Sequence, residues 1–89
     1  MIERELLIAN KLGLHARATA KLVQVLSAYR STATLTAKGR EVNAKSIMGV
    51  MLLAAGQGTP VTVRVDGDDE ADALAAVIAL FERNFDEAQ

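Results

Sequence analysis

A histidine and an arginine lie two residues apart, between a segment that predicts a strand and one that predicts a helix. His15 is the only histidine of the chain, and Arg17 follows it in the sequence Gly-Leu-His-Ala-Arg. The helix pattern begins directly after His15, so this residue should occupy or adjoin the N-cap. Ser, Thr, Asp or Asn usually fills that position, and a histidine that breaks such a local rule suggests a functional site.

The chemistry available at this position is the handling of anions. A helix N-terminus presents free N–H groups and the positive end of the helix dipole, which bind phosphate and favour the neutral form of His15. A neutral imidazole is nucleophilic, and the guanidinium of Arg17 matches phosphate oxygens. These features suggest a residue that accepts a phosphoryl group. On residue types alone, an exposed histidine without a role is an equal alternative.

Length and composition restrict the class of protein. The chain has 89 residues, which predicts one domain over residues 1–89, and 51 % hydrophobic against 24 % charged residues is typical of a globular protein. The net charge of −1 argues against a nucleic acid partner, and the lack of cysteine excludes disulfides and thiolate metal sites. A helix that spans a membrane needs about 20 apolar residues, and no apolar run in the chain is that long. Residues 1–5 also lack the pattern of a signal peptide. We therefore expect a cytoplasmic protein.

Hydrophobic periodicity predicts four strands and three helices. Alternating patterns predict strands at residues 2–8, 32–37, 40–43 and 59–66. Helical spacing predicts helices from residue 16 to about 27, from 46 to about 55, and from about 68 onward. The order βαββαβα predicts a two-layer α+β open-faced sandwich, in which a four-stranded antiparallel sheet carries three helices on one face.

The first and last helices each have an apolar stripe at helical spacing. The stripe of the first helix consists of Ala16, Thr19, Ala20, Val23, Leu26 and Ala28. The stripe of the last helix consists of Ala71, Leu74, Ala75, Ile78, Phe81 and Phe85. Four acidic residues crowd the start of the last helix: Asp68, Asp69, Glu70 and Asp72. A metal site is one interpretation of this run, but a solvated helix start that matches the dipole is the stronger one.

The second helix is short and apolar on nearly all sides. Ser46 is its expected N-cap, and residues 47–55 contain no polar side chain. A domain this small cannot easily bury every face of such a helix, so we expect part of it to form an exposed docking surface. Met48 and Met51 suit that surface because methionine adapts to different partners, although a role as core filler is equally compatible with the sequence.

Two motifs make the chain resemble the HPr family, the histidine-containing phosphocarriers of the bacterial phosphoenolpyruvate-dependent phosphotransferase system. The first motif runs from Gly13 to Arg17 and opens the first helix, and the second runs from Lys45 to Met51 and opens the second helix. The resemblance covers the whole chain in length and in element order. It implies a phosphoryl carrier without a substrate of its own, rather than an enzyme, that needs no cofactor and no metal.

The resemblance also implies roles for individual residues. His15 would take a phosphoryl group on Nδ1 from phospho-enzyme I and pass it to an EIIA protein or domain, while Arg17 steadies the phosphate. Ser46 would be the residue that an HPr kinase/phosphorylase modifies for regulation in some lineages. The surface that docks the partners would consist of Ala16, Ala20, Ile47, Met48, Met51 and Leu52. We expect a monomer, and the net charge and the lack of a long apolar run argue against nucleic acid and membrane partners.

Ala18 departs from the family pattern, because many members carry proline directly after the arginine. Alanine is the best helix former, so the chemistry at His15 should be retained. Alanine at this position is also familiar in NPr, the nitrogen-related paralogue. The alternative function is therefore a regulatory nitrogen-branch protein that acts mainly by phosphorylation-dependent protein binding. A small independent enzyme is a weaker alternative, since the motif lacks a second acid–base group and a nucleotide loop.

Overall fold

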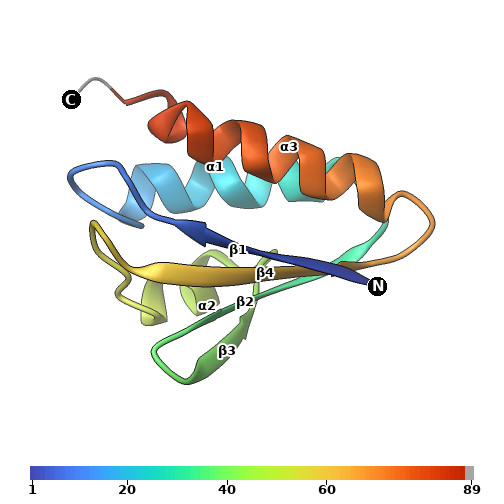
Figure 1. Ribbon diagram of the computed structural model, residues 1–89, viewed down its shortest axis with the longest axis horizontal. Coiled ribbons are helices and arrows are strands. Elements are labelled where there is room, and N and C mark those ends of the chain that lie inside the picture. The colour runs from blue at the N-terminus through green and yellow to red at the C-terminus, as the bar shows by residue number, and fades with distance from the viewer. Residues whose placement is uncertain (88–89) are drawn as a thin grey trace.

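The computed structural model describes residues 1–87, which Figure 1 shows as one sheet with helices packed on it. Within these residues the strands are β1 (Ile2–Leu7), β2 (Thr32–Ala37), β3 (Arg40–Asn43) and β4 (Pro60–Asp66). The α-helices are α1 (Ala16–Ser27), α2 (Ile47–Leu52) and α3 (Glu70–Glu82), and a short 3-10 helix, η1 (Asn84–Asp86), follows α3. The predicted α+β architecture with the order βαββαβα is confirmed.

Strand β4 lies between β1 and β2, in an antiparallel sheet with the order β1-β4-β2-β3. Val63 is opposite Arg4 of β1 and Leu35 of β2, and Leu35 is opposite Val42 of β3. Alternate residues of β2 and β4 point into one core: Ala33, Leu35, Ala37, Val61, Val63 and Val65. Helices α1 and α3 run side by side over the sheet (Figure 1), while α2 contacts α1 and β3. The helices therefore cover the apolar face of the sheet.

Helix α1 buries a different stripe from the predicted one. Ala18, Leu22 and Leu26 are fully buried at a spacing of four residues, whereas Ala16 and Ala20 are exposed. The prediction assigned these two alanines to the core because alanine is apolar, but the larger side chain of Leu22 determines which face is buried. The two exposed alanines instead leave part of the α1 surface apolar and open to solvent.

Two of the predicted helices end earlier than their apolar patterns. Helix α2 stops at Leu52, and Ala54 adopts a left-handed φ of 50°, which terminates a helix. Helix α3 stops at Glu82, and the three residues of η1 have positive φ values of 54°, 56° and 61°. Left-handed backbone costs about 1–2 kcal/mol for each non-glycine residue. Phe85 offsets part of this cost, since it is buried with its ring centroid 4.8 Å from that of Phe81.

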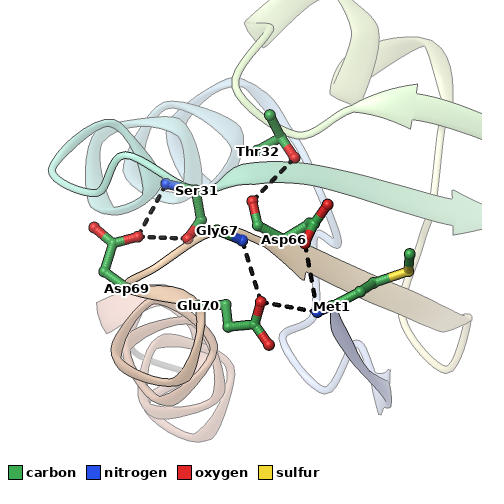
Figure 2. A network of polar contacts seen from close by, with 7 residues as sticks. All are labelled: Met1, Ser31, Thr32, Asp66, Gly67, Asp69 and Glu70. Atoms are coloured by element: carbon green, nitrogen blue, oxygen red, sulfur yellow. Dashed lines mark hydrogen bonds and ion pairs between the residues drawn. The ribbon is translucent and has the colours of Figure 1, made fainter.

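A network of carboxylates joins the start of α3 to the sheet (Figure 2). Asp69 accepts hydrogen bonds from the backbone N–H groups of Arg30 and Ser31, at 2.8 and 2.9 Å, and from the hydroxyl of Ser31. Glu70 accepts one from the backbone N–H of Gly67, at 3.1 Å. Part of the acidic run thus has a structural role that the sequence did not predict, and no group of three or more metal-ligating side chains occurs within residues 1–87.

We expect acid to weaken the fold through Asp69. The hydrogen bonds from Ser31 and Arg30 lower the pKa of Asp69 to about 2. Because the unfolded value is about 3.9, the contribution of this carboxylate to stability is present above about pH 4 and lost as the pH falls through 2. Urea denaturation of the wild type and of Asp69→Asn between these pH values should show the difference in unfolding free energy shrinking with acidification. Asp72→Asn, at an exposed position in the same helix turn, is the control for the loss of one negative charge.

Candidate functional site

The loop before α1 is held against the loop that follows α2. The backbone N–H of Leu14 donates to the carbonyl of Ala55 at 2.9 Å, and that of Gly13 donates to the carbonyl of Asn10 at 3.2 Å. Leu14 is buried, and its carbonyl accepts a hydrogen bond from the hydroxyl of Thr19 at 3.2 Å. These contacts fix the path of the backbone on both sides of His15.

His15 occupies the N-cap of α1, as predicted. Its backbone is extended, with φ −80° and ψ −177°, and its carbonyl accepts the first helical hydrogen bond, from Thr19, at 2.9 Å. The imidazole makes no capping hydrogen bond to the helix, so the first N–H groups of α1 have no partner from this side chain. The side chain is 29 % exposed, which leaves it open to an approaching molecule.

A carboxylate from the opposite end of the chain contacts the imidazole. Oε2 of Glu87 hydrogen-bonds to Nε2 of His15, and Oε1 of Glu87 accepts a hydrogen bond from Nδ2 of Asn10 at 3.0 Å. Asn10 is fully buried, and its Nδ2 also donates to the carbonyl of Gly13 at 2.8 Å. Asn10 therefore connects the carboxylate of Glu87 to the same loop that positions His15.

The ionisation of Glu87 determines which nitrogen of His15 carries the proton. Burial alone would raise the pKa of Glu87, but hydrogen bonds from Asn10 and His15, together with the charge of Arg17, outweigh this effect and lower the pKa. An ionised carboxylate can only accept hydrogen bonds, so Nε2 of His15 must donate. In the neutral imidazole Nδ1 then has the free lone pair and is the nucleophilic nitrogen.

Arg17 and two acidic residues line the same hollow as the imidazole. An open hollow in the surface is lined by Lys11, Leu12, His15, Ala16, Arg17, Asp86 and Glu87. Arg17 is exposed in the first turn of α1, and a guanidinium at this position matches the oxygens of an anion bound at the helix start. The hollow therefore combines an imidazole with an available lone pair, the N–H groups of a helix N-terminus and an exposed cation.

The second predicted motif forms a separate feature beside α1. Ser46 is the N-cap of α2, as predicted, and its Oγ accepts a hydrogen bond from the N–H of Gly49 at 3.1 Å. Val50 is buried beneath the helix, whereas four apolar side chains are exposed: Ile47, Met48, Met51 and Leu52. The predicted partial exposure of this helix is confirmed. We use the name α2 patch for these four residues.

Comparison with known proteins identifies the family. The family described as "PTS HPr component phosphorylation site" matches residues 2–83. The chain belongs to the HPr family. A protein named phosphocarrier protein HPr from Xylella fastidiosa (strain 9a5c) is 66 % identical over 98 % of both chains, and one of that name from Cupriavidus necator is 51 % identical over the whole of both. The crystal structure of HPr-C-His from Thermoanaerobacter tengcongensis matches the whole chain with a TM-score of 0.96 at 43 % identity.

Membership of the HPr family gives a context for the residues that the sequence singled out. The relatives are named as carriers of phosphate rather than as catalysts. The structure brings His15, Ala16 and Arg17 together in one hollow. Ser46, Ala20 and the α2 patch lie outside that hollow, on α1 and α2, two helices that contact each other. No helix within residues 1–87 has the length and apolar character to cross a membrane.

The sequence does not predict two residues of this site, Asn10 and Glu87. Asn10 falls in the loop before the first helix, and Glu87 lies beyond the last residue of the predicted apolar stripe. Glu87 follows the left-handed residues of η1, and an apolar stripe that continues to Phe85 gives no indication of such a turn. Asn10 lies in the loop between the strand at residues 2–8 and Gly13, and its residue type alone does not indicate that the structure buries it.

Proposed function

We propose that this chain carries a phosphoryl group on Nδ1 of His15, between phospho-enzyme I and an EIIA protein or domain of the phosphotransferase system. The observation that carries the proposal is the engagement of Nε2 by Glu87, because it leaves Nδ1 as the nitrogen with a lone pair. In the accepting step, Nδ1 forms a bond to phosphorus as the bond from phosphorus to the donor imidazole breaks. The passing step reverses these roles, so no net proton is needed.

Charge neutralisation at the helix start supports this proposal. Phosphoryl transfer depends mainly on in-line approach and on stabilising the charge of the equatorial oxygens. The first N–H groups of α1 and the guanidinium of Arg17 can supply that stabilisation, while the docked partner supplies the alignment. Arg17 is exposed, so it can follow the phosphate without losing a buried contact.

The α2 patch supports docking of both partners. Ile47 is 48 % exposed, Met48 74 %, Met51 43 % and Leu52 60 %, which is unusual for apolar residues on one short helix. Together with the exposed Ala16 and Ala20 they give an apolar surface on α1 and α2. We propose that a cytoplasmic monomer uses this surface for enzyme I and for EIIA in turn.

The test is transfer from phosphoenolpyruvate through enzyme I to the wild-type chain labelled with ¹⁵N in its single histidine. Nuclear magnetic resonance of the ring nitrogens should show one phosphate on Nδ1. A phosphate on Nε2, a phosphate on another residue, or none from either of the host's enzymes I would contradict the proposal. Uptake from the nitrogen-branch enzyme I alone would favour the regulatory NPr-like alternative.

We further propose that modification of Ser46 by an HPr kinase/phosphorylase would inhibit docking rather than unfold α2. A phosphate would add about −1.5 to −2 charge at the helix start, where the dipole tolerates it, but next to the α2 patch. Its N-cap hydrogen bond explains the presence of Ser46 without any modification, so the proposal needs a direct test.

Ser46→Asp is expected to slow phosphorylation by enzyme I about tenfold, which corresponds to about 1.4 kcal/mol of docking free energy. Ser46→Asn is the matched control, because Asn and Asp are equally good N-caps and only Asp adds charge. The measurement is the initial rate of phosphorylation by enzyme I at low concentrations of each variant. Melting temperatures of both variants show whether the fold is intact. Equal rates for Asp and wild type, or an equal loss in Asn and Asp, would show that charge at this position does not control docking.

A further inference from the structure

Glu87 stands out because the backbone before it is strained and its side chain reaches the imidazole. Three consecutive residues of η1 are left-handed without a glycine among them. Strain of this kind persists only where the surrounding structure over-determines it, and it is concentrated at functional sites. The contacts that follow the strained turn are those of Glu87 with His15 and Asn10.

The turn has a clear geometric consequence. A right-handed continuation of α3 would carry the chain onward along the helix axis, by about 1.5 Å for each residue. Instead, η1 packs against α1, and the end of α3 lies at the same end of the molecule as the loop before α1 (Figure 1). Phe85 anchors the turn by burial, and Glu87 follows it two residues later. The turn thus delivers a carboxylate to the site from 72 residues away in sequence.

We propose that Glu87 is a positioning residue, which holds the Nε2–H tautomer of His15 and so presents Nδ1 as the acceptor of the phosphoryl group. This inference rests on the proposed function. Glu87 neither touches the phosphate nor takes up a proton from it. It acts through the ring, in the way that carboxylates fix the tautomer and orientation of metal-binding histidines.

Asn10 holds the carboxylate of Glu87 through a hydrogen bond to the oxygen that does not contact His15. Its Nδ2 donates to Oε1 of Glu87 and to the carbonyl of Gly13, so the second carboxylate oxygen is tied to the backbone of the loop. Because Asn10 is fully buried, this arrangement restricts rotation of the carboxylate. The low pKa of Glu87 agrees with a carboxylate that stays ionised while it holds the ring.

The first readout needs no transfer reaction. In unphosphorylated protein at alkaline pH, the ¹⁵N resonances of His15 should show the Nε2–H tautomer in the wild type and a mixture of both tautomers in Glu87→Ala. Glu87→Asp, which keeps the charge but shortens the side chain, should also lose the preference. Glu82→Ala is the control, since Glu82 is an exposed carboxylate at the end of α3 that does not line the hollow. It should keep the wild-type tautomer.

The second readout is the rate of phosphorylation by enzyme I. Glu87→Ala should lower the rate at saturating carrier about tenfold to a hundredfold, the range found when the partner of a metal-bound histidine is removed. The half-saturating concentration should change less than the rate, because Glu87 adds no apolar side chain to the docking surface. Spectra that retain the dispersion of the folded protein would establish that each variant is intact.

The two proposals fail in different ways. A wild type that accepts no phosphate would contradict the proposed function, whatever the tautomer. An active wild type in which His15 already has the Nδ1–H tautomer, or a Glu87→Ala variant with unchanged tautomer and unchanged rate, would overturn the role of Glu87 alone.

Discussion

Replacing His15 with serine is expected to abolish phosphoryl uptake and to leave a protein more stable than the one with alanine at this position. Both variants lose the imidazole and its contact with Glu87, so transfer should stop in both. Serine can accept a hydrogen bond from the start of α1, as the histidine does not, and a capping oxygen is worth about 1 kcal/mol relative to alanine. A histidine at this N-cap is therefore expected to give a less stable helix start than serine would.

Urea denaturation of the two variants, with mass spectrometry after incubation with enzyme I and phosphoenolpyruvate, would measure both effects. Equal unfolding free energies for serine and alanine would mean that the helix start cannot use a cap. An acid-labile phosphate on either variant would place the acceptor outside His15 and contradict the proposed mechanism.

Replacing Gly13 with alanine is expected to lower the unfolding free energy by about 3 kcal/mol and to reduce transfer strongly. Gly13 has a left-handed φ of 68°, and a Cβ added there would lie 2.5 Å from the carbonyl oxygen of Ala55 and 2.6 Å from Cα of Gly56. Both neighbours are backbone atoms, so they cannot rotate away, and overlap adds to the cost of the left-handed conformation. Relief of the overlap would push the loop off Ala55 and displace the backbone that orients His15.

Gly39→Ala is the matched control for this effect. Gly39 also has a left-handed φ, of 76°, but an added Cβ would meet no atom within 4 Å. Its loss should be about 1 kcal/mol, the cost of the backbone conformation alone, with normal phosphorylation by enzyme I. Equal losses of unfolding free energy in Gly13→Ala and Gly39→Ala would show that the close approach of Gly13 to Ala55 and Gly56 does not contribute to the effect.

The sequence predicts the strands and the helix starts well, but it does not predict the structure near the C-terminal end of α3. The strands were found almost to the residue, because their alternation is simple and their boundaries carry turn residues. The N-caps at His15 and Ser46 were also found, since a local pattern determines a cap. The buried stripe of α1 was partly wrong, because alanines satisfy a helical period on either side of Leu22.

Glu87 could not be predicted, for a physical reason. Its contact with His15 joins residues 72 positions apart and depends on three left-handed residues that carry no glycine. Asn84 and Asp86 are residue types that tolerate this backbone, but Phe85 is not, so the burial of Phe85 in the complete fold is needed to select the turn. His15 and Arg17 lie in one local segment, so the sequence predicts that part of the site. Glu87 follows η1, and its place in the site depends on the complete fold.

The central place of β4 has a consequence for synthesis on the ribosome. Strands β1 and β2 each pair with β4 and not with each other. The strand that joins them is therefore missing until residues 60–66 leave the exit tunnel of the ribosome. Until then a nascent chain holds β1 and the β2–β3 hairpin with open edges, the kind of surface that chaperones cover and that aggregates. The complete sheet can therefore assemble only after Pro60–Asp66 has been synthesised, whereas the β2–β3 hairpin can form before that point.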